Sequence, residues 1–183
     1  MAPYHFVLVH FPLALWTTAA LVIFLRALSD GSLAKASDGI LVPLLGLGVL
    51  SGVLAYVVGF LVWPWETLTA SPLARNHFLA ATWSLAYWTL LLVTRWIQGE
   101  AIWEGATRWV MLGLAALGGI LLTITGTLGG HLAGAPTAVS KVLHFFGWDV
   151  YTTFYVPDVT LWLLAAASVA LFALGVWGRR RQA

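Results

Sequence analysis

The sequence predicts an all-α integral membrane protein, a single transmembrane domain over residues 1–183, on three observations. The 183 residues are 61% hydrophobic and only 9% charged, and the mean hydropathy of +0.90 lies outside the usual range of a soluble domain. The apolar runs are continuous and near the length of about 20 residues that one crossing needs. Because a bilayer offers no water to backbone polar groups, these runs are expected to form a helical bundle.

We expect five transmembrane helices, and together they use most of the chain. They form a four-helix core followed by one further helix, and the longest loop lies on the outer side of the membrane. The predicted helices cover residues 6–28, 40–63, 74–97, 107–130 and 159–178, and the outer loop covers 133–158.

Turn and capping residues mark the ends of these helices. Pro3 suits the first turn of the first helix, and Pro64, in "WPWE", ends the second. Ser71 is expected to cap the third helix, with Pro72 at its first position. The fourth helix is rich in glycine and ends near "GGHLAGAP", and the fifth contains no histidine and runs into a basic tail.

Lysine and arginine predict the orientation of the bundle. With five crossings, seven of the nine cationic residues fall on one side of the membrane, and the cation-rich side is normally cytoplasmic. We therefore expect the N-terminus outside and the C-terminus in the cytoplasm. The inner set is Arg26, Lys35, Arg95, Arg108, Arg179, Arg180 and Arg181, and the outer set is Arg75 and Lys141.

The chain contains no cysteine. This excludes disulfides, thiolate-bound zinc, iron–sulfur clusters and the covalent haem attachment of a C-x-x-C-H motif. A cofactor would have to be held by histidine, methionine, carboxylate or backbone groups.

All five histidines fall on the predicted outer side, including His144 in the last outer loop. Counting about 1.5 Å per residue from the inner arginine of each helix, His10 and His77 lie roughly 24 and 27 Å up, just inside the hydrocarbon. His5 and His131 lie at a shallower level, roughly 32 and 34 Å up. The histidines therefore form two pairs, each at its own depth.

These pairs predict a haem site. Ionisable groups inside a bilayer are costly and mark functional sites by default. Neutral imidazole is the commonest haem and metal ligand, and two imidazoles from facing helices form the axial pair of a b-type haem. We expect His10 and His77 to be the first axial pair. His131 with His5 would hold a second haem, a metal ion or a quinone headgroup.

Further residues fit a flat cofactor that carries acidic groups. Gly126 and Gly130 recur at helical spacing on the fourth helix and would let a macrocycle approach the backbone, although such faces also serve close helix packing. Arg75 and Lys141, the two outer cations, could pair with haem propionates. His144 is interpreted as an interfacial anchor.

The segment "HFVLVHFPLAL", residues 5–15, resembles the opening of an uncharacterised family of small bacterial inner-membrane haem-binding domains, H-P-x-x-[VI]-H-F-P-[IL]-A-L. His77 in "ARNHF" and the segment "TLGGHLAG" match its later motifs, so the resemblance covers roughly the first four helices. Phe6 replaces the usual proline, and the family's aromatic-x-His-Gly tail is absent unless His144 substitutes for it. The resemblance implies a b-type cytochrome-like subunit in the bacterial inner membrane, with a periplasmic N-terminus.

We expect a membrane-anchored b-type cytochrome subunit, with one or two haem b groups, that transfers electrons between a periplasmic-side redox protein and the quinone pool within a larger complex. Membrane lipid is an expected partner and nucleic acid is not, and an electron-transfer subunit is expected more than a stand-alone enzyme. Glu66, Asp149 and Asp158 could orient a ligating imidazole or serve quinone proton chemistry. A histidine-based copper or zinc protein and a purely structural anchor remain alternatives.

Overall fold

The computed structural model describes residues 2–155, 158–160, 162–163, 165–167, 169–170 and 173, and every regular element that these residues form is a helix. In chain order the helices are α1 (Ala2–Leu8), α2 (His10–Leu28), α3 (Ser32–Asp38), α4 (Leu41–Val62), α5 (Trp65–Thr69), α6 (Pro72–Gln98), the 3-10 helix η1 (Gly99–Trp103), α7 (Thr107–Leu132) and α8 (Val139–Phe145).

Four helical segments are long and apolar enough to cross a membrane. This confirms the prediction of an all-helical fold with helices of membrane-spanning length. Half of the predicted fifth helix, 159–178, lies outside the described residues, so the fifth crossing stays a prediction. The four spans are Ala2–Leu28, Ser32–Val62, Pro72–Trp103 and Thr107–Leu132.

The helix ends agree with the capping residues in the sequence. The Ser71 hydroxyl accepts the backbone N–H of Ala74 at 3.2 Å, and Pro72 opens α6. The first span starts earlier than predicted, at Ala2, and Val9 separates α1 from α2. The predicted outer loop contains the short helix α8.

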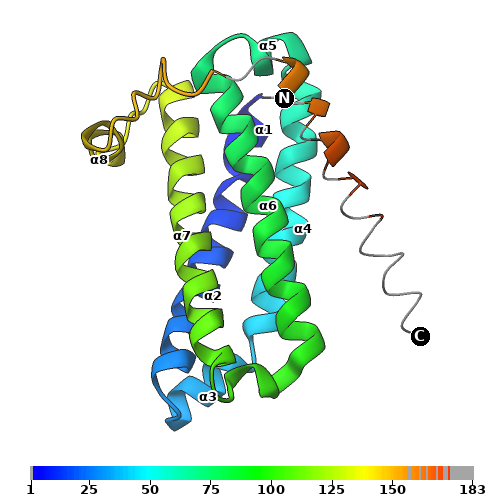
Figure 1. Ribbon diagram of the computed structural model, residues 1–183, viewed down its shortest axis with the longest axis vertical. Helices are drawn as coiled ribbons and strands as arrows, with labels where there is room; N and C mark the ends of the chain where they lie inside the picture. Colours follow the sequence, from blue (N-terminus) through cyan, green and yellow to red (C-terminus); the bar gives the residue numbers. More distant parts are fainter. Residues whose placement is uncertain are drawn as a thin grey trace.

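The long helices stand side by side in a bundle (Figure 1). α2 packs against α4 and α7, and α6 packs against the same two helices. α2 and α6 therefore occupy one diagonal of the bundle, and α4 and α7 occupy the other. α3 lies at one end, and α5, α8 and the N-terminus lie toward the opposite end, which we call the histidine end.

The centre of the bundle is filled by two tryptophans on the α2–α6 diagonal. Trp16 and Trp88 are almost fully buried, with ring planes 6° apart and ring centroids 5.5 Å apart. Trp16 lies against Gly48 of α4, and Trp88 lies against Gly118 of α7; a methyl carbon added at either glycine would lie within 3.1 Å of an indole atom. We call this pair the tryptophan layer.

Charged side chains pair at the end that carries α3 and η1. Asp38 is buried, and its carboxylate accepts a hydrogen bond from Arg95 at 2.7 Å and from the indole N–H of Trp103 at 3.0 Å. Asp30, between α2 and α3, accepts from Arg108 at 2.7 Å. Asp30 and Asp38 thus join α3 and the turn before it to α6, η1 and α7. The charges are tolerated there because each has a partner of opposite sign.

At the histidine end, polar residues at the start of α6 hold the segment that follows α8. The Arg75 guanidinium donates to Asp158 at 2.7 Å and lies 4.8 Å from the centre of the Tyr155 ring. The Asn76 amide donates to the carbonyl of Thr153 at 2.7 Å. Arg75 was predicted to face haem propionates, but it is 2% exposed and engaged with this segment.

Candidate functional site

His5, on α1, places its ring against α4. Its Nδ1 lies 2.9 Å from the carbonyl oxygen of Ala55. A methyl carbon added at Gly59, one turn further along α4, would lie 3.2 Å from the Cε1 atom of the imidazole. The missing side chain at Gly59 therefore makes room for the ring, and Trp63 closes over it edge to face with ring centroids 5.1 Å apart.

His77, on α6, is held against α7 in the same way. Its Nδ1 lies 3.2 Å from the carbonyl oxygen of Thr125. A methyl carbon added at Gly129 would lie 3.0 Å from the imidazole Cε1. The Thr125 hydroxyl also forms a hydrogen bond of 2.9 Å with Ser84, which fixes the spacing of α6 and α7 just below the ring.

The two histidines share one local pattern. In each case the carbonyl belongs to the residue four positions before the glycine, so one helical turn both accepts from the imidazole and makes room for it. The histidines occupy the α1/α2–α6 diagonal and the glycines occupy the α4–α7 diagonal. His5 and His77 lie within electrostatic range of each other. We call this pair the histidine layer.

The hydrogen bonds decide which ring nitrogen carries the proton. A backbone carbonyl only accepts, so Nδ1 of His5 and of His77 is the protonated nitrogen. Nε2 then keeps its lone pair, and within the described residues neither Nε2 has a hydrogen-bond partner. The arrangement therefore offers two oriented nitrogen donors from opposite corners of the bundle.

The structure does not bring His10, the predicted partner of His77, into the interior of the bundle. Its side chain is exposed, and its Nδ1 lies 2.6 Å from the carbonyl oxygen of Phe6 in the preceding turn of its own chain segment. The count of residues per helix could not give the direction of the side chain, which lies on the outside of the bundle.

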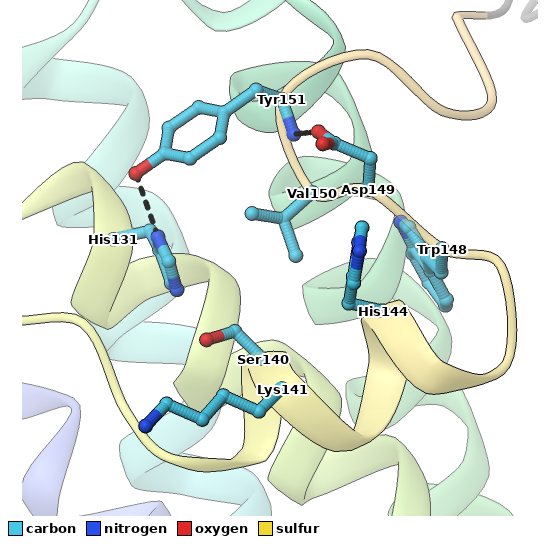
Figure 2. Close-up of a pocket in the computed structure, with 8 residues that line it drawn as sticks. All are labelled: His131, Ser140, Lys141, His144, Trp148, Asp149, Val150 and Tyr151. Atoms are coloured by element: carbon cyan, nitrogen blue, oxygen red, sulfur yellow. Dashed lines mark hydrogen bonds between the residues drawn. The ribbon is translucent and has the colours of Figure 1, made fainter.

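His131 and His144 line a separate cavity of about 270 Å³ at the histidine end (Figure 2). Nδ1 of His131, near the end of α7, lies 2.8 Å from the Tyr151 hydroxyl. Lys141, one of the two predicted propionate partners, also lines this cavity. The structure thus brings His131 together with Tyr151 rather than with His5, and it gives His144 a place in a cavity wall.

The glycines predicted to admit a cofactor have other neighbours. A methyl carbon at Gly126 would make an ordinary contact with Leu13, and one at Gly130 would lie 2.8 Å from the carbonyl oxygen of Ala135 in the following turn. Sequence reasoning missed Gly59 and Gly129, the two glycines that touch imidazole rings. In "GGH" the adjacent glycines differ only in which helix face they occupy, and a single sequence does not fix that face.

Three-ligand metal sites are not found in the part of the chain that the structure describes. No group of three or more histidine, cysteine, aspartate or glutamate side chains there could hold a metal ion. Of the predicted outer carboxylates, Asp158 pairs with Arg75, and Asp149 accepts the backbone N–H of Tyr151 at 2.9 Å. Neither carboxylate forms a hydrogen bond with His5 or His77.

The family resemblance noted in the sequence stays a prediction, because no family model, no curated protein and no solved structure matches the chain.

Proposed function

We propose that this chain is a membrane-anchored b-type cytochrome subunit, with one haem held between His5 and His77. The observation that carries the proposal is the matched seating of the two imidazoles, each with Nδ1 on a backbone carbonyl and its edge against a glycine. This revises the axial pair predicted from sequence, since His5 takes the place of His10.

The donor set suits haem better than a bare metal ion. Zinc and copper sites commonly use three or four protein ligands, and the described residues provide no such group. A b-type haem needs only two imidazoles, because the macrocycle supplies the other four nitrogens. Hydrogen bonds from Nδ1 to backbone carbonyls are the usual way in which a protein orients ligating histidines.

Haem, when bound, would supply a reversible one-electron couple, and the chain's own residues would set its surroundings. Ala55 and Thr125 fix the two ring orientations, and Trp63 covers the His5 ring. The tryptophan layer, Trp16 with Trp88, closes the bundle on the other side and keeps water out of its centre. A dry site with few free hydrogen-bond donors would limit the reorganisation that accompanies electron transfer.

We further propose that the histidine end faces the periplasm of a bacterial inner membrane, where a redox protein or partner subunit exchanges electrons with the haem and the quinone pool. The charge distribution supports this orientation, because the opposite end carries more cations and such ends are normally cytoplasmic. In the described residues that end carries Arg26, Lys35, Arg95 and Arg108, whereas the histidine end carries Arg75 and Lys141.

The first test is a reduced-minus-oxidised absorption spectrum of the purified protein, with a pyridine haemochrome assay for haem per chain. We expect a b-type spectrum and one haem per chain. A folded protein that contains no haem after growth with ample haem would overturn the cytochrome proposal. Two haems per chain would contradict the single site between His5 and His77.

A further inference from the structure

Two cavities meet at the histidine end, and they differ in character. The polar cavity is the one lined by His131, Lys141, Asp149 and Tyr151 (Figure 2). The second cavity, also about 270 Å³, lies between α6 and α7 and is walled by aliphatic and aromatic side chains such as Leu121 and Ile124. Trp148 lines both cavities, so a polar chamber and an apolar groove share one wall.

The polar cavity suits an uncharged ligand that has both donor and acceptor forms. Lys141 and Asp149 contribute one charge of each sign, which disfavours a free anion or cation. The ring nitrogens of His131 and Trp148 include two buried atoms, Nε2 and Nε1, with no hydrogen-bond partner among the described residues. Leaving such atoms unpaired is costly, and both belong to residues that line the cavity, so a small movement of either ring would let a ligand oxygen pair with it.

The contact between His131 and Tyr151 allows Nε2 of His131 to be either a hydrogen-bond donor or an acceptor. If the Tyr151 hydroxyl donates to Nδ1, then Nε2 carries the proton and can donate to a ligand carbonyl. If Nδ1–H donates to the hydroxyl, then Nε2 has a lone pair and can accept from a ligand O–H. One imidazole can thus serve both the oxidised and the reduced form of the same ligand while keeping its contact with Tyr151.

We propose that these cavities form a binding site for an isoprenoid quinone, with the ring in the polar cavity and the first part of the tail in the apolar groove between α6 and α7. Each cavity lies slightly below the range of about 300–1,000 Å³ for drug-sized ligands, which fits one ring and a short length of chain. This inference rests on the proposed cytochrome function and gives it a quinone site.

The place of the cavity supports this assignment. His131 follows Gly129, the residue that seats the His77 ring, by two positions on α7. The two positions are about 3 Å apart along the helix axis but about 200° apart around it, so the polar cavity and the histidine layer lie at a similar level on different faces of α7. A quinone ring bound there would lie at the level of the haem of the proposed function, across α7 from it.

The redox step balances with groups named above. When a quinol occupies the polar cavity, its two O–H bonds break and it becomes the quinone. The two protons leave through His131 and the Asp149 carboxylate to the surrounding water. The two electrons would leave one at a time to a one-electron acceptor; the haem that His5 and His77 would hold could supply that couple, with the partner redox protein as the final acceptor. Electron flow in the opposite direction uses the same groups in reverse.

A phospholipid is the competing occupant. Its phosphate would be drawn to Lys141, but Asp149 lines the same cavity and would repel it, whereas a neutral quinone meets no such penalty. A bare metal ion lacks ligands, since the described residues hold no group of three suitable side chains.

Saturation binding to the full chain in nanodiscs tests the site, with empty nanodiscs subtracted. The two probes are decylubiquinone and its tail-less parent, 2,3-dimethoxy-5-methyl-1,4-benzoquinone. We expect His131→Ala to weaken both probes at least tenfold, because it removes a ring contact. Leu121→Trp should weaken decylubiquinone at least tenfold and the tail-less probe less than twofold, because it fills only the groove.

Two matched variants serve as controls. His10→Ala removes an exposed histidine at the same end, and Leu117→Trp adds the same bulk one turn away on α7, outside the groove; both should leave binding within twofold. Thermal unfolding confirms that each variant is folded. Unchanged binding in folded His131→Ala and Leu121→Trp would overturn the site, as would displacement of decylubiquinone by phosphatidylglycerol in mixed nanodiscs.

Haem content measured on the same samples separates this inference from the proposed function. Quinone binding that responds to both variants in a protein without haem would sink the cytochrome proposal and leave the quinone site standing. A haem-loaded protein whose quinone binding ignores both variants would overturn the site alone.

Discussion

Two layers of the bundle use the same scaffold for different purposes. In the tryptophan layer, Trp16 and Trp88 stack on one diagonal against glycines of the other two helices. In the histidine layer, His5 and His77 occupy the same diagonal and also rest against glycines. The arrangement of helices is therefore common to both layers, and the ring type and its polar contacts make the difference.

Packing holds the tryptophan rings in place, whereas hydrogen bonds to backbone carbonyls hold the imidazoles and fix their orientation. The indole N–H groups of Trp16 and Trp88 are buried without a hydrogen-bond partner among the described residues, so stacking and burial must stabilise this layer. Each imidazole instead donates from Nδ1 to a carbonyl, which fixes the ring's orientation and leaves Nε2 available. The packed tryptophan layer therefore stabilises the bundle, and the oriented imidazoles of the histidine layer are suited to binding a ligand.

The largest effect is expected from removing an imidazole. His77→Ala and, separately, His5→Ala should lower haem per chain to less than a tenth of the wild-type value, because a b-type haem with two histidine ligands loses one of them. The pyridine haemochrome assay on folded protein measures this. His10→Ala is the matched control and should keep at least four fifths of the haem. Loss of haem in His10→Ala with retention in His5→Ala would restore the axial pair predicted from sequence.

The tryptophan layer should show the opposite response. Trp88→Ala removes a fully buried ring and should lower the free energy of unfolding by about 3–5 kcal/mol, as large-to-small core substitutions do. Haem per folded chain should fall much less than in His77→Ala. Denaturant unfolding in detergent measures the change, and Trp96→Ala, at an exposed position on the same helix, should change stability by less than about 1 kcal/mol. Equal losses in both variants would contradict the role of Trp88 in the core.

The sequence predicted the spans well because their signals are local. Continuous apolar runs, the Ser71 cap and Pro72 define helix ends without any tertiary information, and α6 and α7 begin and end within two residues of prediction. The rotation of each helix about its axis was not predictable, because glycine and leucine occur on every face of a membrane helix.

That missing rotation explains why the structure groups the site residues differently from the sequence-based pairs. His10 and His5 lie five residues apart, on different sides of the first span, and only packing against α4 selects His5. Gly129 and Gly130 differ by about 100° around α7, which decides that one touches His77 and the other touches the turn after the helix. Asp158, which accepts a hydrogen bond from Arg75, lies 83 residues away along the chain, so no local sequence pattern predicts this ion pair.

A smaller effect is expected where a glycine that seats an imidazole gains a side chain. Gly129→Ala would place a methyl carbon 3.0 Å from the His77 ring, so the ring must move by a few tenths of an ångström. An off-rotamer shift costs about 0.5–1.5 kcal/mol, so the dissociation constant for haem should rise about two- to tenfold. Haem titration of apoprotein measures it, and Gly119→Ala, which opens onto free space on the same helix, should bind haem like wild type. An unchanged constant in Gly129→Ala would show that the close contact does not position the ring.

The smallest effect concerns the end opposite the histidine layer. Hydrogen bonds from Arg108 and then Arg26 lower the pKa of Asp30 from its ordinary value to about 2. A carboxyl whose pKa is lower in the folded state stabilises the fold above its unfolded pKa, near 4, and loses that contribution as the pH falls through about 2. The melting temperature of the wild type should therefore slightly exceed that of Asp30→Asn at pH 6, and the difference should vanish near pH 2, whereas Glu104→Gln, at an exposed site, should match the wild type throughout. Haem per chain should be equal in all three proteins at pH 6, because Asp30 lies at the far end from the imidazoles; a lower value in Asp30→Asn would show that the two ends are coupled.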